Sequence, residues 1–344
     1  MSRRSLTLLI AAIGTAAAIA VSVLIPVPYV ILGPGPTLNT LGKDSSGQAL
    51  ITISGHPSFP TSGHLNMVTV SYQGCQGNTF NIFTALVAWL NPHEAVVPEG
   101  EICPAGQTQQ QTQQQDTQQM TSSQQSATAA ALTELHIPYQ TQVVVVQTVP
   151  GYPAHGVLRA GDVIIAVDGK PVTSASGLST LIYAHPAGST LTATILRDGK
   201  TQNVQVGTKQ SGGHPVMGVE ITEKYKFPFD VRISVGDIGG PSAGLMFALG
   251  IIDKLTPMNL TGGKFIAGTG EIEASGKVDP IGGIQQKMIG ARQAGATIFL
   301  TPASNCADAK GAVPAGLRLV SVSTLSQAVN DLEAIQAGQQ VPSC

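Results

Sequence analysis

The chain has 344 residues, which is enough for two ordinary domains together with accessory segments. Apolar residues make up 42% of it, charged residues make up only 11%, and the net charge is −2. Nucleic-acid binding needs a concentrated Lys and Arg surface, and the chain has no long basic block. We therefore expect no nucleic-acid partner.

The first segment in chain order is an apolar run over 6–25 that follows two arginines. Such a run has about the 20 residues that cross the hydrocarbon core of a bilayer. Positive charges before it predict a cytoplasmic N-terminal tail over 1–5 and an extracytoplasmic remainder. We therefore predict a single-pass anchor over 6–27 in the cell membrane. A cleaved signal peptide is the alternative, because the alanines at 16–18 could be a cleavage point.

The four cysteines have neither a CxxC pair nor a metal-ligand spacing, so we expect no metal site. In an oxidising compartment, disulfides are the default state of cysteine. Pairing by proximity predicts the disulfides Cys75–Cys103 and Cys306–Cys344. Four cysteines allow three connectivities, and four free thiols remain the alternative.

Three local patterns follow the apolar run. Prolines over 26–36 predict an extended spacer. Alternating apolar residues over 49–53 and 65–70 predict a β-hairpin, and 80–90 predicts a short amphipathic helix. Because the hairpin lacks a core of its own, we expect it to pack on the last domain through a strand contact between 65–70 and 217–240.

Residues 106–126 are mostly Gln, Thr and Ser, a composition that cannot bury much apolar area. They predict a flexible or surface-exposed insertion, with an alanine-rich helix restarting over 127–135. Together with the preceding segments they define an extracytoplasmic N-terminal region over 28–136.

A second unit, over 137–208, has a distinctive order of elements. Its features are a β run at 143–146, Leu158, Gly161-Asp162-Val163-Ile164, an Asp168-Gly169 turn, a helix over 174–183 and a strand over 191–197. This order resembles the permuted PDZ domains of bacterial envelope proteases.

PDZ domains receive a peptide as an added strand at a sheet edge. The resemblance therefore implies a groove between the first strand and the helix, lined by Val143, Val145, Leu178 and Ile182. A small β-domain that binds nothing is the alternative.

The last unit, over 215–338, alternates strands and helices, which is an α/β pattern. Strands are expected at 231–235, 264–269, 297–301 and 317–322, and helices at 241–255, 283–294 and 325–335.

Ser242 is the centre of a Gly-x-Ser-x-Gly motif near the start of this unit. The α/β-hydrolase elbow with this motif needs a histidine downstream, but no histidine follows His214. The serine hydroxyl still needs a base, because it is almost wholly protonated at neutral pH. The remaining downstream bases are the lysines Lys254, Lys264, Lys277, Lys287 and Lys310.

Lys287 differs from the other lysines in its sequence context. On a helix that starts near Gly283, Lys287 shares one face with Ile284 and Met288. An apolar environment desolvates the amine and lowers its pKa, and the positive helix N-terminus acts in the same direction. Since a neutral amine can accept a proton, we predict Lys287 as the general base for Ser242.

Three blocks of the last unit resemble the Lon-type peptidase domain. They are Pro241-Ser242-Ala243-Gly244, Gly268-Thr269-Gly270-Glu271-Ile272 and Pro280-Ile281-Gly282-Gly283-Ile284-Gln285-Gln286-Lys287. The resemblance implies that Ser242 and Lys287 are the catalytic pair and that Thr269 contacts the lysine. Gly240, Pro241 and Ala243 support the serine.

One departure from the Lon pattern concerns the residue three positions before the serine. Many Lon domains have an acidic residue there, whereas this chain has Gly239. Asp237 lies two residues further back, and its role stays open.

The order of anchor, PDZ domain and Lon-type domain resembles the membrane-anchored PDZ–Lon proteases of bacteria. The fold class expected is an α/β (α+β) Lon-type domain plus a mainly-β PDZ domain after one N-terminal transmembrane helix. The chain has no Gly-x-x-x-x-Gly-Lys-Ser/Thr motif, so we expect no nucleotide use and no cofactor.

The resemblance implies an ATP-independent serine endopeptidase that cleaves extracytoplasmic proteins or peptides. Its PDZ domain would recruit substrate, and a homo-oligomer is compatible with the family. Two rival functions are a membrane-tethered PDZ adaptor with an inactive Lon-like domain and a hydrolase of non-peptide acyl bonds.

Overall fold

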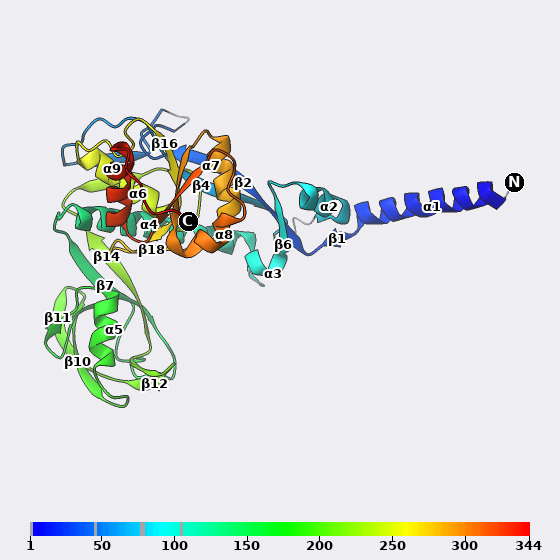
Figure 1. Ribbon diagram of the computed structural model, residues 1–344. Coiled ribbons are helices and arrows are strands. Elements are labelled where there is room, and N and C mark those ends of the chain that lie inside the picture. The colour runs from blue at the N-terminus through cyan, green and yellow to red at the C-terminus, as the bar shows by residue number, and fades with distance from the viewer. Residues whose placement is uncertain (1–2, 45–46, 76–79, 104–105) are drawn as a thin grey trace. The chain divides into compact units, whose positions relative to one another are not determined.

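The computed structural model describes residues 3–44, 47–75, 80–103 and 106–344. The chain divides into two compact units, which Figure 1 colours along the sequence. The first unit contains both ends of the chain, and the second is inserted between them. They comprise Met1–Ile137 with Phe229–Cys344, and Pro138–Pro228.

The first unit is organised around a six-stranded sheet with the order β20-β19-β16-β4-β2-β6. Neighbours from β20 to β4 are parallel, whereas β2 is antiparallel to β4 and to β6. The strands are β2 (Tyr29–Asn39), β4 (His64–Gln73), β6 (Ala95–Pro98), β16 (Phe265–Gly268), β19 (Ile298–Pro302) and β20 (Arg318–Val322).

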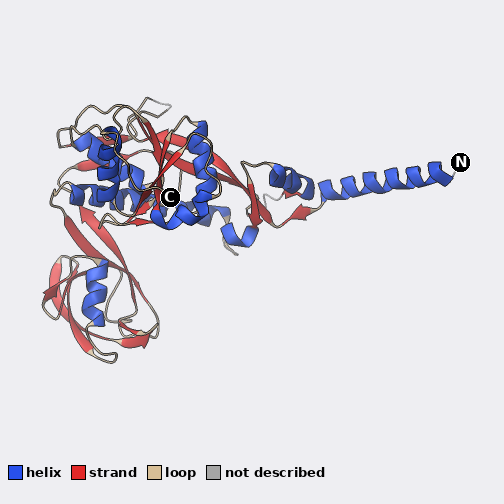
Figure 2. Ribbon diagram, in the orientation of Figure 1, coloured by secondary structure: helices blue, strands red, loops and turns tan. Residues whose placement is uncertain are grey.

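Helices cover the two faces of this sheet (Figure 2). Alternate strand residues point to opposite faces. Ala267 and Phe299 pack with Met288 of α7 (Ile284–Gln293), whereas Gly268 faces Met246 of α6 (Gly244–Leu255). Strands covered on both faces are mostly apolar and buried along their whole length, as all five residues of β19 are buried.

The remaining elements of the first unit are short, apart from α1 and α4. The strands are β1 (Pro26–Val27), β3 (Ile51–Ser54), β5 (Phe80–Asn81), β15 (Asp230–Ile233), β17 (Glu271–Ile272) and β18 (Val278–Asp279). The helices are α1 (Arg3–Leu24), α2 (Ile82–Leu90), α3 (Glu99–Ile102), α4 (Gln109–Glu134), η1 (Ala303–Asn305), α8 (Cys306–Lys310) and α9 (Leu325–Gln336).

The N-terminal helix α1 covers most of the anchor expected over 6–27. Within the described ranges, however, no helix has the combined length and apolar character that crossing a membrane requires. Residues 26–36 are extended, as expected, but they are not a spacer, because β1 and β2 form there and β2 belongs to the central sheet.

The predicted hairpin does not form. β3 pairs with β15, and β4 lies between β2 and β16. The segment does pack within the first unit, but the strand contact with 230–233 comes from 51–54 and not from 65–70. Sequence alternation predicted the two strands correctly and could not assign their partners, because pairing in this sheet is between distant parts of the chain.

The Gln-rich segment is largely surface-exposed, as one of the two expected alternatives holds, but it is helical: its residues 109–126 form about the first two-thirds of the 26-residue helix α4. The helix starts in a capping box, in which Thr108 and Gln111 bond each other's backbone N–H. Met120, Ser123 and Ala127 are buried at helical spacing. Because these residues share one face, α4 packs against α6, β17 and α9.

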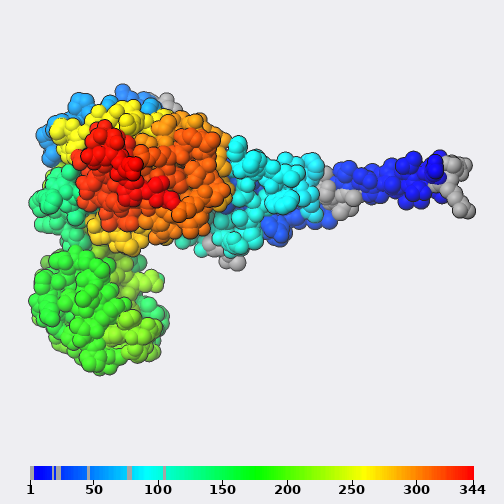
Figure 3. All heavy atoms as spheres, viewed as in Figure 1, coloured from blue at the N-terminus to red at the C-terminus, as the bar shows by residue number. Residues whose placement is uncertain are grey.

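Both predicted disulfides form in the structure, with Cα–Cα distances of 5.9 Å for Cys75–Cys103 and 5.1 Å for Cys306–Cys344. The second one attaches the C-terminal residue to α8. The backbone N–H of Ser321 also bonds to the Pro342 carbonyl. In Figure 3 the red C-terminal residues accordingly lie against the orange ones.

The second unit is a sheet with the strand order β11-β10-β8-β7-β14, with the helix α5 (Ala175–Tyr183) packed on it. Its strands are β7 (Gln140–Thr148), β8 (Val163–Val167), β9 (Lys170–Pro171), β10 (Thr190–Arg197), β11 (Lys200–Gly207), β12 (Lys209–Ser211), β13 (His214–Val216) and β14 (Val219–Lys226). Because β14 pairs with β7, this unit extends beyond the boundary expected at 215.

A buried ion pair supports the second unit beside its apolar core. Burial alone would raise the pKa of Asp162, but hydrogen bonds from Arg197 and from the Arg159 N–H outweigh that effect and lower it. The Asp162 side chain is 1% exposed and lies 2.7 Å from the Arg197 guanidinium. The buried Asp162 carboxylate therefore has hydrogen-bond partners and a counter-charge that offset the cost of removing it from water.

Candidate active site

Ser242 lies in the loop that leads into α6. Pro241 and Ser242 are half-buried, and the following Ala243 is buried at the helix N-cap position. Nearly every residue of α6 is buried, so the helix is fixed in the core and holds the loop at its N-terminus. Gly240, with a φ of 86°, makes a left-handed turn just before the proline.

The turn after β16 fixes the backbone of Ser242. The Ser242 carbonyl accepts hydrogen bonds from the Gly270 N–H at 2.8 Å and from the Thr269 hydroxyl at 2.9 Å. Thr269 is itself fully buried, and its N–H bonds to the Leu300 carbonyl on β19. The central sheet therefore positions the serine through Thr269.

Lys287 lies in the first turn of α7, with only 4% of its surface exposed. Burial lowers the pKa of its amine to about 8. Its Nζ lies 3.4 Å from the Thr269 hydroxyl oxygen, the same hydroxyl that donates to Ser242. Thr269 thus connects the two predicted catalytic residues.

Gly283 allows α7 to begin beside β4. Its φ of 66° is left-handed, and a Cβ there would lie 2.6 Å from the Val70 side chain. Only glycine fits both conditions without strain. Lys287, one turn further along, is consequently placed next to β4.

Ser242 and Lys287 line one cavity of about 490 Å³. Its walls are mainly apolar and come from β2, β4, α4 and the loop before α6. The wall residues include Leu32, Met67, Val68, Val70, Met120 and Ile238. Such a cavity can accommodate apolar parts of a substrate.

A second cavity of about 390 Å³ shares wall residues with the first, including Tyr72, Asp116 and Asp237. Burial raises the pKa of the Asp116 carboxyl. It also raises the pKa of Tyr72, and the nearby Asp116 charge adds to that effect. Asp237, whose role the sequence left open, is exposed and lines both cavities.

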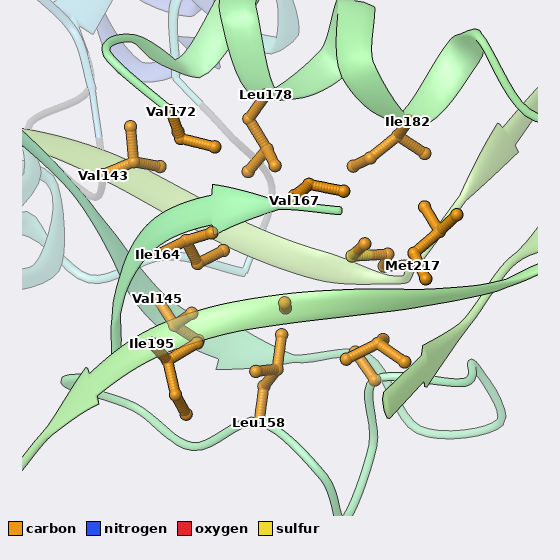
Figure 4. Packing of buried hydrophobic residues seen from close by; sticks show 14 residues of the cluster. Val143, Val145, Leu158, Ile164, Val167, Val172, Leu178, Ile182, Ile195 and Met217 are labelled. Atoms are coloured by element: carbon orange, nitrogen blue, oxygen red, sulfur yellow. The ribbon is translucent and has the colours of Figure 1, made fainter. Parts of the chain in front are cut away.

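The four residues predicted to line the PDZ groove do not line an open surface. Val143, Val145, Leu178 and Ile182 are all buried, at 0 to 7% exposure, in the core of the second unit (Figure 4). Moreover, β7 is bonded on one side to β8 and on the other to β14. These apolar residues form the core of the unit and not a binding surface.

Sequence reasoning missed the contribution of α4 to the candidate active site. Met120 and Asp116 line the cavity, and Ser123 bonds to the Pro241 carbonyl. The available signal was the spacing of Met120, Ser123 and Ala127, which continues the alanine-rich helix backwards into the Gln-rich segment. Among the described side chains, no three His, Cys, Asp or Glu residues gather as a metal site.

Two protein families match parts of the chain. Residues 111–208 match the PDZ domain family, and residues 222–334 match the family described as the Lon protease (S16) C-terminal proteolytic domain. The PDZ match begins within α4, which packs in the first unit, whereas the Lon match begins within β14 of the second unit.

Curated relatives are Lon proteases of bacteria. The Lon protease of Syntrophomonas wolfei is 30% identical over 135 residues, which are 37% of this chain and 16% of that protein. Lon protease 1 of Bacillus subtilis is 31% identical over 116 residues, which are 32% of this chain and 15% of that protein. The chain therefore spans less than a fifth of the length of these relatives.

Solved structures match a little under a quarter of the chain. The PDZ domain of an SdrC-like protein from Listeria innocua is 24% identical, covers 23% of this chain and 92% of that one, and has a TM-score of 0.22. A Geobacillus thermodenitrificans protein is 32% identical over 22% of this chain and 85% of its own, with a TM-score of 0.20. By its sequence matches, the chain carries a PDZ domain and a Lon-type proteolytic domain, and the latter supports a serine peptidase activity.

Proposed function

We propose that the chain is an ATP-independent serine endopeptidase in which Ser242 is the nucleophile and Lys287 the general base. The observation that carries this proposal is the state of Lys287. Its amine is buried, has a pKa of about 8 and lines the same cavity as Ser242. A lysine in ordinary surroundings stays protonated near neutral pH and cannot take a proton.

In this mechanism the Ser242 Oγ attacks the scissile carbonyl while its proton passes to the neutral Lys287 Nζ. The resulting ammonium then donates that proton to the leaving amine, and water hydrolyses the acyl-enzyme by the reverse proton path. Thr269 keeps the lysine and the serine backbone in a fixed relation. The Ser242 and Ala243 N–H groups at the start of α6 are the proposed donors to the oxyanion.

The apolar walls of the cavity favour an extended peptide as the substrate, and the PDZ domain is proposed to recruit it. A peptide must enter as a flexible segment, because a cavity of about 490 Å³ holds only a few side chains. Unfolded or loop segments of proteins fit this requirement.

Hydrolysis of casein and of a fluorogenic peptide by the full chain tests the proposal. Ser242→Ala and Lys287→Ala should each remove activity by several orders of magnitude, as the loss of members of a catalytic unit does. ATP should leave the wild-type rate unchanged. Undiminished hydrolysis in both variants would refute the catalytic assignment, and an inactive wild-type chain would favour a PDZ adaptor.

We also propose that the enzyme works outside the cytoplasm and is tethered to the cell membrane by its N-terminal segment. The two disulfides support an oxidising compartment. The tether is supported by the apolar sequence over 6–25 after two arginines. The protein should remain in the membrane pellet after an alkaline carbonate wash and be digested by protease added to intact spheroplasts. Recovery of undigested protein in the cytosol would contradict this location.

A further inference from the structure

The part of the loop that precedes Ser242 is rich in glycine and is therefore only weakly restrained by its own sequence. Gly236, Gly239 and Gly240 precede Pro241, and the first and third of these have left-handed φ angles of 62° and 86°. Glycine allows many backbone conformations, so a glycine-rich loop gains rigidity only from outside contacts. The contacts on the other side of the serine, from Thr269 and Gly270, do not reach these glycines.

The helix α4 supplies the missing restraint through two hydrogen bonds. The Ser123 hydroxyl donates to the Pro241 carbonyl at 2.8 Å, and the Gly240 N–H donates to the Asp116 carbonyl at 3.0 Å. Asp116 and Ser123 are seven residues apart, which is about two helical turns, so both contacts come from one side of α4. They hold the two residues immediately before the nucleophile.

Two glycines permit this close approach of α4. A Cβ on Gly239 would lie 2.5 Å from the Asp116 Cβ, and one on Gly244 would lie 3.0 Å from the Ser123 Oγ. Any side chain at 239 would therefore displace the helix. This accounts for the glycine at position 239, where many Lon domains have an acidic residue.

The helix α4 is anchored in the first unit by its C-terminal half. Its C-terminal half is buried against α6, and Ser123 is 5% exposed between that half and the loop. Met120, one turn earlier, lines the cavity that contains Ser242 and Lys287. The same helix thus holds the loop and forms part of the substrate wall.

We propose that Ser123 is a positioning residue that holds the Ser242 loop in its reactive geometry by its hydrogen bond to the Pro241 carbonyl. The inference rests on the proposed peptidase function. A misplaced nucleophile loses rate without losing substrate binding, so the effect belongs in kcat and not in KM.

Ser123→Ala tests the inference, with Ser122→Ala as the matched control, because Ser122 is the exposed neighbour on the same helix. We expect Ser123→Ala to lower kcat about tenfold, as the loss of one hydrogen bond allows, with little change in KM. The control should keep wild-type values. Unchanged kcat in Ser123→Ala, or an equal loss in the control, would overturn the inference.

A second pair of variants separates the effect of the Ser123 hydroxyl on kcat from the effect of side-chain packing at this position. Ser123→Thr keeps the hydroxyl, and Ser123→Val has nearly the shape of threonine without it. We expect Ser123→Thr to be several-fold more active than Ser123→Val, while both melt at similar temperatures. Equal activity of the two variants would show that the hydrogen bond does not position the serine.

Amide hydrogen exchange at Gly240 supplies a readout that does not depend on catalysis. The Gly240 N–H should exchange faster in Ser123→Ala than in the wild type, because the loop loses its second attachment to α4. If the wild type hydrolyses nothing, the proposed function fails while this exchange result still tests the contact. If exchange is unchanged, the positioning role fails even in an active enzyme.

Discussion

Lys287→Met should stabilise the protein while abolishing its activity. Below pH 8 the wild-type chain must keep a charged amine at a site that is 4% exposed. The pKa falls from 10.5 to about 8, and each unit corresponds to about 1.4 kcal/mol, so the charged lysine costs up to about 3 kcal/mol. Methionine has a similar length and no charge, so it removes that cost.

The stability advantage of Lys287→Met over the wild type depends on pH, because burial lowers the pKa of Lys287 in the folded chain only. Between about pH 8 and 10.5 the unfolded chain keeps the lysine proton and the folded chain does not, so wild-type stability rises with pH. The advantage of Lys287→Met should therefore shrink by about 2 kcal/mol between pH 7 and pH 9.5.

Urea unfolding followed by circular dichroism at these two pH values measures the effect. Lys310→Met, at an exposed lysine of α8, is the control and should stay within about 0.5 kcal/mol of the wild type. A Lys287→Met variant that is less stable than the wild type at pH 7, or an advantage that does not change with pH, would refute the reasoning.

Three further outcomes follow from the structure. The kcat/KM for a peptide should rise about tenfold from pH 7 to pH 9, because the neutral fraction of an amine with a pKa of about 8 rises from about 9% to about 91%. A kcat/KM that does not change with pH would argue against Lys287 as the general base. Arg197→Met should destabilise the PDZ unit by about 3 kcal/mol in a melting experiment by leaving Asp162 buried and unpaired, and a neutral result would contradict the account of that pair. Replacing Cys306 and Cys344 together by serine should lower the free energy of unfolding by about 4 kcal/mol, because the disulfide closes a loop with a sequence separation of 38 in the unfolded chain. An unchanged urea midpoint would contradict a stabilising role of this disulfide.

Local sequence patterns were sufficient for the elements that carry the candidate catalytic residues. The helix with Lys287 was predicted over 283–294 and forms over Ile284–Gln293. Its apolar face was visible from the spacing of Ile284, Lys287 and Met288, and those side chains are buried. An i, i+3, i+4 pattern depends only on neighbouring residues, which is why it was sufficient here.

Local sequence patterns could not predict contacts between segments that are distant in the chain. The hairpin prediction failed because alternation defines a strand's faces and not its partner, so β3 paired with residues 230–233. The Gln-rich segment is surface-exposed but not flexible, because it is part of a helix; composition alone conceals the single buried face of that helix, on which Ser123 lies. The PDZ groove was misplaced for a related reason, since Val143 and Leu178 are equally apolar in a core or in a groove.

Covalent labelling of Ser242 tests the central claim most directly. A fluorophosphonate reacts with an activated serine hydroxyl, and mass spectrometry of the digested protein locates the adduct. We expect an adduct on the peptide that contains Ser242, formed faster at pH 9 than at pH 7 and lost in Lys287→Met. Labelling of another residue, or equal labelling of Ser242 in Lys287→Met, would contradict a mechanism in which the buried lysine activates this serine.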